Sequence, residues 1–345
     1  MKPQYREYMM EQLKRLLKID STTGFYREIE TYLAKEISRM GYEPELMNKG
    51  GVIAHAGGYG SGLVVMAHAD DIGLMARYVN ADGSIRVAPV GGLLPIYCDN
   101  VNVRLYTRSG KSYTGTMRRH NGCTHRMMEG ERLDTPDYDK NLFLYLDEDV
   151  ATAEQVRALG IRCGDFIAPS PDLIITDSGY IKSRFIDDKA LVAVLLAYLK
   201  YIKEEGVSLS RSVTAHFSMY EEIGHGGSCG VSQSDSEVLA LDVACCGPFG
   251  YSDEKKVSIC AKDASFPYHY DMVTRLAQAA QDAGADYEID MYLPRYGSDA
   301  NAALRAGFDV RHGLIGPGVT ASHGYERTHI NGLVNTFKLL CAYAR

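Results

Sequence analysis

Apolar positions recur at helical spacing near both ends of the chain. Met9, Leu13, Leu16 and Leu17 fall on one side of a charged segment, which predicts an amphipathic helix and not the apolar core of a signal peptide. The run from Ala190 to Leu199 is apolar on most sides, as expected for a buried helix, and is far too short to span a bilayer. Helices are predicted over residues 1–20, 26–40, 189–203, 268–284 and 331–343.

Two kinds of strand pattern lie between these helices. The stretches GGVIAHAGG, GLVVMAHAD, SVTAHFSMY and VLALDVACC are short apolar runs, typical of buried strands that alternate with helices. Residues 73–164 differ, because short strands separated by turns such as ADG and SGK replace the helices. We therefore predict an α/β domain made of residues 1–72 and 165–345, interrupted by an inserted β domain over residues 73–164.

Composition narrows the class of protein. The chain has 345 residues, is 46% hydrophobic and carries a net charge of -7, and it shows no cluster of lysine or arginine that would follow a phosphate backbone. We therefore expect no nucleic-acid partner and no membrane association. The eight cysteines include no CxxC pair, which favours a reduced, cytoplasmic protein.

Two adjacent aspartates, Asp187 and Asp188, stand at the start of the predicted buried helix. Asp188 could cap the helix by accepting a backbone N–H bond from its first turn. That interpretation leaves Asp187 unexplained, since two like charges in contact near a core are costly to ionise unless a cation neutralises them. The pair therefore predicts a nearby cation.

Further carboxylates and histidines follow the ends of predicted strands, where the ligand sites of open α/β sheets lie. Each one alone has an ordinary structural explanation, such as a hydrogen-bonded core histidine or a capping aspartate. Taken together, imidazoles and carboxylates in this pattern match the needs of two zinc-like ions that share one carboxylate. The strand-end residues are His68, Asp70, Asp71, Glu221, Glu222, Asp242 and His323.

The ordered set resembles a known family, the tetrahedral metalloaminopeptidases, which include glutamyl aminopeptidases and proteins once labelled cellulases. The resemblance covers essentially the whole chain and extends to YGSDANAALRAG, which is similar to the family's Gly-Thr-Asp-Ala segment. It implies a zinc-peptidase α/β domain with a mixed central sheet flanked by helices, interrupted by a small β-barrel-like insert. The segments that carry it are HAD at 68–70, DD at 187–188, EE at 221–222, Asp242 and His323.

The resemblance implies two divalent metal ions per chain. One ion would be held by His68, Asp187 and Asp242, and the other by Asp187, Glu222 and His323. Asp187 would then bridge the two ions, which accounts for a carboxylate that a helix cap does not explain. Zinc is the expected metal, with cobalt or manganese as alternatives because availability often decides.

The resemblance also implies roles for three neighbouring carboxylates. Glu221 would be the catalytic base that deprotonates the bridging water and later protonates the leaving amine. Asp70 would orient His68 from behind, as carboxylates commonly do for metal-bound imidazoles. Asp188 would support the geometry through a cis peptide after Asp187.

The function implied by the resemblance is a metallo-aminopeptidase that hydrolyses N-terminal residues from peptides. In that family the insert mediates dimers that assemble into a hollow dodecamer, so dimers and a dodecamer are expected. A binuclear amidohydrolase acting on acylated amino acids or other small amides would use the same ligands and is the alternative. A non-catalytic metal scaffold would not need Glu221, and a glycosidase would need two carboxylates flanking a sugar in an open groove.

Some positions depart from the family pattern. Tyr220 stands where a glutamine often precedes the two glutamates, Ser298 replaces a threonine, and Val319 and Thr320 replace an arginine–tyrosine pair. These departures bear on the substrate pocket, so the preferred N-terminal side chain of the substrate stays open. The histidines whose roles also stay open are His120, His125, His225 and His329.

Overall fold

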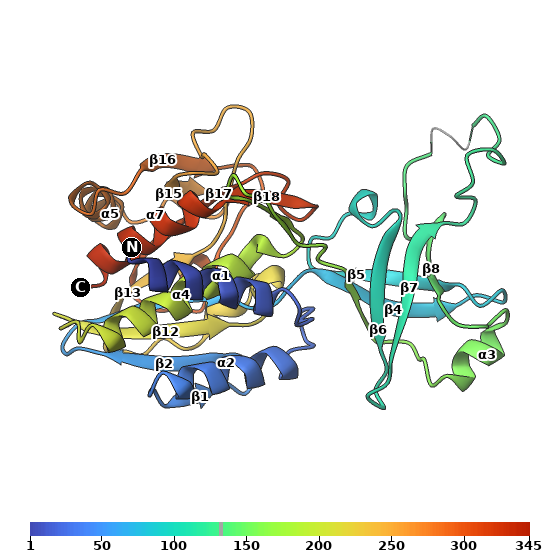
Figure 1. Cartoon of the computed structure of the whole chain (residues 1–345), viewed down its shortest axis with the longest axis horizontal. Coiled ribbons are helices and arrows are strands. Elements are labelled where there is room, and N and C mark those ends of the chain that lie inside the picture. Colours follow the sequence, from blue (N-terminus) through green and yellow to red (C-terminus); the bar gives the residue numbers. More distant parts are fainter. Residues whose placement is uncertain (131–133) are drawn as a thin grey trace. The chain divides into compact units, whose positions relative to one another are not determined.

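The computed structural model describes residues 1–130 and 134–345, and its contacts divide the chain into two units (Figure 1). The larger unit comprises Met1–Asp71 and Asp172–Arg345, and the smaller one comprises the described part of Ile72–Pro171. The smaller unit extends beyond residue 164, where the sequence pattern placed its end, because strand β9 (Phe166–Pro169) pairs with two of its strands. The boundary therefore follows strand pairing and not the change in composition.

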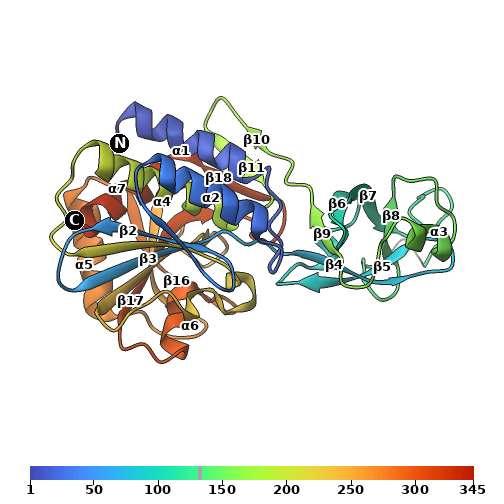
Figure 2. The ribbon, with the colours of Figure 1, turned by 90° about the horizontal axis from the view of Figure 1, so that it is seen from below.

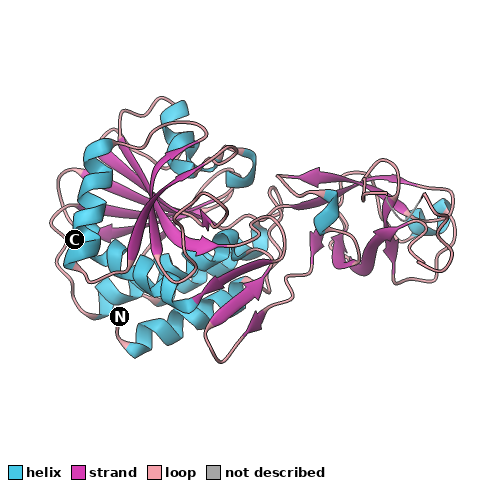
Figure 3. Cartoon of the chain, turned by 90° about the horizontal axis from the view of Figure 1, so that it is seen from above, coloured by secondary structure: helices cyan, strands magenta, loops and turns pink. Residues whose placement is uncertain are grey.

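A mixed sheet, with nine strands among the described residues, forms the centre of the larger unit. Its main path runs β1-β2-β12-β3-β13-β17-β15-β16, and β14 pairs with β17 beside this path. Figure 3 shows these strands fanning out, as the usual twist of a sheet requires. The strands are β1 (Pro44–Leu46), β2 (Val52–Gly57), β3 (Gly62–His68), β12 (Ser212–Ser218), β13 (Asp235–Leu241), β14 (Ala244–Cys245), β15 (Val257–Asp263), β16 (Tyr287–Tyr292) and β17 (Arg311–Val319).

Parallel pairing gathers four strand ends at one edge of this sheet. β3 lies parallel to β12 and β13, and β13 lies parallel to β17, so the carboxyl ends of all four point the same way. His68 ends β3, and Asp242 directly follows β13. Glu221 and Glu222 follow β12, and His323 follows β17. Residues from distant parts of the sequence therefore meet at one edge.

Helices cover both faces of the sheet. Figure 2 shows α1, α4 and α7 on one side and α6 on the other, where alanines of α6 pack with Val64 and Met66 of β3. α4 is buried along most of its length, which explains its nearly continuous apolar sequence. Among the described residues, none of the helices combines the length and the apolar character needed to cross a membrane. The helices are α1 (Pro3–Leu16), α2 (Arg27–Arg39), α4 (Ile186–Glu204), α5 (Tyr270–Asp282), α6 (Asp299–Arg305) and α7 (Ile330–Tyr343).

A three-stranded antiparallel sheet supports the beginning of α4. It consists of β10 (Ile174–Ile175), β11 (Tyr180–Ser183) and β18 (Glu326–His329), paired in that order. Ser183 lies opposite Glu326 in this register, and the chain leaves β11 to enter α4. The segment that follows β17 is thereby held alongside the segment that precedes α4.

The smaller unit is a closed barrel in the order β4-β5-β8-β7-β6-β9. Alternate residues of β6 are buried, as expected for a strand with one face toward a barrel interior. The mixed sheet with flanking helices and the separate barrel confirm the fold class expected from the sequence. The remaining elements are β4 (Gly73–Val79), β5 (Ile85–Val90), β6 (Val101–Tyr106), β7 (Ser112–Arg119), β8 (Leu142–Leu146) and α3 (Ala153–Ala158).

His216 on β12 is an imidazole buried in the sheet without a hydrogen bond. Its side chain is fully buried, and neither ring nitrogen has a partner among the described residues. Gly230 packs against it so closely that a Cβ at this glycine would lie 2.8 Å from the ring. Burial, followed by the positive charge of Lys49, lowers the pKa of His216 to about 3.

We expect His216 to make the fold sensitive to acid. Its pKa is about 3 when folded and 6.5 when unfolded, so the stability present above pH 6.5 is lost as the pH falls toward 3. Between pH 7 and pH 5 this loss is on the order of 2 kcal/mol. Urea unfolding at both pH values should show a smaller loss for His216→Leu than for the wild type. The exposed His55→Leu should behave as wild type, and equal pH dependence in all three proteins would contradict the prediction.

Candidate metal centre

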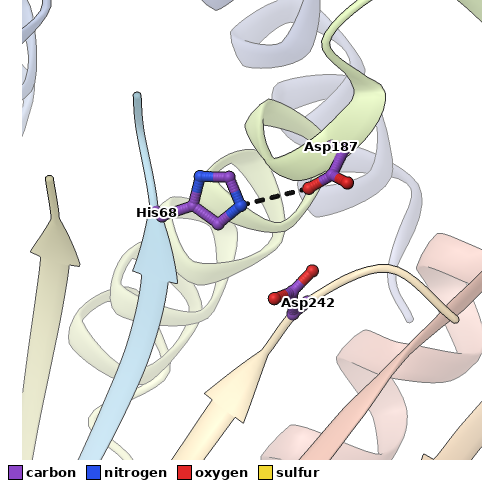
Figure 4. A group of neighbouring side chains, drawn as sticks. All are labelled: His68, Asp187 and Asp242. Carbon is purple, nitrogen blue, oxygen red and sulfur yellow. Dashed lines mark hydrogen bonds and ion pairs between the residues drawn. The ribbon is translucent and has the colours of Figure 1, made fainter. Parts of the chain in front are cut away.

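Three side chains converge where the ends of β3 and β13 meet the start of α4 (Figure 4). They are His68, Asp187 and Asp242, and all three are buried. His68 Nε2 lies 3.1 Å from Asp187 Oδ1. One ligand atom from each of the three residues lies within 4.8 Å of the others. An imidazole with two carboxylates at this spacing is a donor set that suits a divalent metal ion.

A second group shares Asp187 with the first. It consists of Asp187, Glu222 and His323, again with one ligand atom of each within 4.8 Å of the others. His323 Nε2 lies 3.3 Å from Glu222 Oε2 and 3.7 Å from Asp187 Oδ2. Asp187 Oδ1 faces the imidazole of His68, whereas Asp187 Oδ2 faces the imidazole of His323. The two oxygens of this carboxylate therefore belong to the two different ligand groups.

Negative charge exceeds positive charge at this site. Burial, followed by the charge of Asp187, raises the pKa of both Asp242 and Glu222 well above the usual range. Burial also raises the pKa of Glu221. Burial opposes the charged form of His68, but its hydrogen bond to Asp187 and the charge of Glu221 raise its pKa well above the usual value. Divalent cations would supply the missing positive charge, so the residues fit such ions.

Asp70 contacts His68 mainly through its backbone carbonyl group. The sequence had led us to expect a contact through its carboxylate. His68 Nδ1 lies 3.0 Å from the carbonyl oxygen of Asp70 and 3.7 Å from its carboxylate. The carboxylate instead accepts the N–H groups of Glu221 and Glu222, at 3.2 and 3.4 Å, and the hydroxyl of Thr23 at 2.6 Å. Asp70 therefore contacts the imidazole with one group and holds the two-glutamate turn with another.

Asp188 ties β3 to α4. The peptide between Asp187 and Asp188 is cis, as expected, and both residues have non-helical dihedral angles. The Asp188 carboxylate accepts the N–H of His68 at 3.1 Å. The interpretation of Asp188 as a helix cap is therefore wrong, because its side chain is directed to the strand and not to the first turn of the helix.

Three polar residues that were given no role from the sequence also hold this site. Ser322 Oγ donates to Asp187 Oδ2 at 3.0 Å, and Glu326 accepts the N–H of Asp187 at 3.1 Å. Asp299 accepts the N–H of Gly227 at 2.7 Å, in the turn that follows the two glutamates. Asp299 lies in the YGSDANAALRAG segment, which carries a sequence signal, whereas no local pattern marks the contacts of the other two residues.

Backbone strain gathers at the same segments. Phe185 has φ 66° just before α4, and Tyr220 has φ 71° just before the two glutamates. Ala321 and His323 have φ 57° and 63° in the segment that follows β17. For residues other than glycine such conformations cost on the order of 1–3 kcal/mol each and persist where the surroundings enforce them. Their concentration here points to a functional site.

The four histidines with open roles lie outside both groups. His120 Nδ1 is 3.0 Å from the hydroxyl of Tyr145 in the barrel, and His329 Nε2 is 2.9 Å from the carbonyl oxygen of Ser178. The other two, His125 and His225, are exposed. Within residues 1–130 and 134–345, none of them belongs to a group with metal-ligand spacing.

Comparison with known proteins identifies the family. Residues 50–339 match the family model described as M42 glutamyl aminopeptidase. The chain belongs to the M42 family. YhfE of Bacillus subtilis, named as a candidate aminopeptidase, is 39% identical over 340 residues, which cover 97% of each chain. The glutamyl aminopeptidase of Lactococcus lactis is 25% identical over 333 residues, which cover 92% of this chain and 90% of that one.

A solved structure shares the fold of this chain. The TET1 peptidase of Pyrococcus horikoshii superimposes with a TM-score of 0.86 at 22% identity, covering 97% of this chain and 99% of that one. As a member of the M42 family, the chain is a peptide hydrolase of the aminopeptidase class, and metal dependence is expected of the family. These findings confirm the resemblance and the predicted activity, and they do not favour the amidohydrolase alternative.

Thr22 and Thr23 are neighbouring threonines that allow the hydrogen bond to Asp70 to be tested with a control. Both are buried, but only Thr23 donates to Asp70, while the Thr22 hydroxyl has no partner among the described residues. We expect Thr23→Val to lower the free energy of unfolding by about 1.5–3 kcal/mol, since a buried carboxylate loses a donor, and Thr22→Val to change it little. Urea unfolding of both variants checks this difference. Equal losses would show that Asp70 does not depend on Thr23.

Proposed function

We propose that this aminopeptidase works with two divalent metal ions per chain. The observation that carries the proposal is the position of Asp187, whose two carboxylate oxygens face the imidazoles of two separate groups. A carboxylate placed in this way can bridge two ions, as in other two-metal hydrolases. A site for a single ion would leave the second group without a use.

Each group is proposed to hold one ion. His68, Asp187 and Asp242 would hold the first, and Asp187, Glu222 and His323 would hold the second. Imidazole and carboxylate are the ligands that zinc takes in catalytic sites that keep a position open for water, so zinc is the ion that we propose. Cobalt and manganese accept the same ligands, and availability decides among such ions.

Glu221 is the proposed catalytic base. When bound, the two ions would polarise the scissile carbonyl and lower the pKa of a water molecule to about 7. Glu221 belongs to neither metal group, yet its Oε2 lies 3.7 Å from His68 Nε2 at the same site. Its carboxylate would accept a proton from the attacking water and pass it to the leaving amine. Asp70, through the N–H of Glu221, keeps this turn in place.

The proposed substrate is a peptide with a free α-amino group. Family membership supports this class over acylated amino acids, which lack the free amine. The Lactococcus lactis relative is named a glutamyl aminopeptidase, but at 25% identity its preference is not transferred to this chain.

All eight cysteines are free, which supports our proposal of a cytoplasmic location.

A substrate panel with metal analysis tests this function. The metal-loaded protein should cleave peptides with a free N-terminus and leave the same peptides intact when they are acetylated. Elemental analysis of the dialysed protein should give about two ions per chain. Hydrolysis of the acetylated set alone would favour the amidohydrolase alternative, and one ion per chain would remove the bridging role of Asp187.

We expect substitutions of the neighbours Glu221 and Glu222 to have different effects on metal binding and on activity. Glu222→Gln should weaken one metal site, because it changes a proposed ligand. Glu221→Gln should keep both metals and lose about 10²–10⁴ in rate, because only the proton transfer is removed. Metal analysis and peptide turnover on the two purified variants check this. A metal-replete and fully active Glu221→Gln protein would place the base elsewhere, and swapped phenotypes would reverse the two assignments.

We also propose that the chain self-associates into dimers and a dodecamer through the barrel unit. The TET1 peptidase of Pyrococcus horikoshii is described as assembling into a tetrahedron or an octahedral shell. On the barrel of this chain, Leu94 and Ile96 are exposed at a short turn of 3-10 helix (Pro95–Tyr97). Apolar side chains grouped at a surface are typical of protein interfaces, which supports this unit as the contact.

Ile96→Asp should reduce the size of the assembly. Light scattering at micromolar concentration should show the wild type as larger than a monomer, and the new charge should shift it to smaller species, since a buried unpaired charge is costly. Leu46→Asp on β1 is the control, because Leu46 is as exposed as Ile96, at 62% against 61%, but lies on the larger unit. A monomeric wild type would contradict the assembly proposal.

A further inference from the structure

Glu326 is a buried carboxylate placed between two chain segments of the metal site. It is the first residue of β18, and its side chain is 2% exposed. It belongs to neither group with metal-ligand spacing. A carboxylate in such a place is stable only where donors surround it, so its partners show what it holds.

The two oxygens of Glu326 accept N–H groups from two distant segments. Oε2 accepts the N–H of Asp187 at 3.1 Å, and Oε1 accepts the N–H of His323 at 3.1 Å. The N–H of Ile186 is a further donor to the same carboxylate. One side chain therefore joins the start of α4 to the segment that follows β17, at the two residues that are proposed to share the second metal ion.

Other contacts hold Glu326 and these segments together. Backbone hydrogen bonds join Thr320 and Arg327 in both directions, at 2.9 and 3.1 Å, and so close the loop between them. Within this loop, Ser322 Oγ donates to Asp187 Oδ2 at 3.0 Å. Asp187 is thereby held at its N–H by Glu326 and at its carboxylate by Ser322.

We propose that Glu326 is a positioning residue for the metal centre. It holds the backbones of Asp187 and His323 at a fixed separation, so that both side chains meet one ion without a rearrangement of the chain. The proposal rests on the proposed function, in which these two residues are ligands. Groups behind a metal ligand commonly change metal affinity by about 10–100-fold when they are removed, because the ligands lose their orientation.

The substitution Glu326→Gln separates this role from simple packing. The amide has the size of the carboxylate, but only one of its two ends can accept an N–H bond, so one of the two segments loses its anchor. Glu254→Gln is the matched control. Glu254 is another carboxylate against this loop, with a side chain that is 11% exposed, and it accepts from the hydroxyl of Thr320 at 2.6 Å and from Arg327 Nε at 2.9 Å. These two bonds hold the loop at Thr320 and Arg327, the residues at which it closes.

Metal affinity is the decisive measurement. Competition of the metal-free variants with a chromophoric chelator for zinc should give a Kd about 10–100-fold higher for Glu326→Gln than for the wild type, and an unchanged Kd for Glu254→Gln. Saturating zinc should restore the kcat of Glu326→Gln with an unchanged KM for a peptide. Wild-type zinc affinity in Glu326→Gln would overturn the proposal.

A second variant and a reference keep the test decisive. If metal-free Glu326→Gln does not fold, Glu326→Asp takes its place, because it keeps the carboxyl group but is too short to reach both segments. It should weaken zinc binding to a similar degree, and wild-type affinity or loss of the fold in this variant would overturn the positioning role. Asp187→Asn, measured in the same assay, tests the proposed function by itself. If it binds two zinc ions as tightly as the wild type, the ligand assignment fails whatever Glu326 does.

Discussion

Repulsion among buried carboxylates at one edge of the sheet is the constraint on which the rest of this structure depends. Asp242 and Glu222 each place an oxygen within 4.8 Å of an oxygen of Asp187, and burial together with the charge of Asp187 makes both costly to ionise. The imidazoles of His68 and His323 offset part of this cost through their contacts with Asp187. The carboxylates of such a cluster can all be charged only when cations are bound. The geometry of the cluster and its proposed metal chemistry therefore depend on each other.

The carboxylates of this region divide into two classes by their partners. Asp70, Asp188 and Glu326 accept backbone N–H groups, and each of them thereby ties two chain segments together. Those of the two metal-type groups approach imidazoles and one another, and Asp242 Oδ1 also accepts the N–H of the next residue, Val243, at 2.6 Å. These N–H donors favour the charged form, but burial is the larger effect and raises the pKa of Asp188 and Glu326 well above the usual range. The first class ties chain segments together, and the second presents the oxygens that are proposed to bind ions.

The sequence allowed prediction of those features that depend on local order. The fold class followed from the alternation of strands and helices, and residues such as His68 were found because a polar side chain ending an apolar strand is a local pattern. Contacts across the chain were not predictable in this way. Asp187 and Glu326 are 139 positions apart and meet only because β11 pairs with β18. Asp70 was identified from the sequence as a partner of His68. Whether its carbonyl group or its carboxylate faces the imidazole depends on backbone geometry, which the sequence does not show. The end of the barrel was misplaced for a similar reason, since β9 closes it through non-local pairing.

Three of the four positions that depart from the family pattern, Ser298, Thr320 and Tyr220, have a structural role in turns or helix ends. Ser298 is buried, caps α6 and lies 2.8 Å from the hydroxyl of Tyr268. Thr320 donates to Glu254, and Tyr220 adopts the left-handed conformation that turns the chain into the two glutamates. A substitution at such a position changes how these turns are held. Any effect on the side chains that face the metal site is then transmitted through the turns.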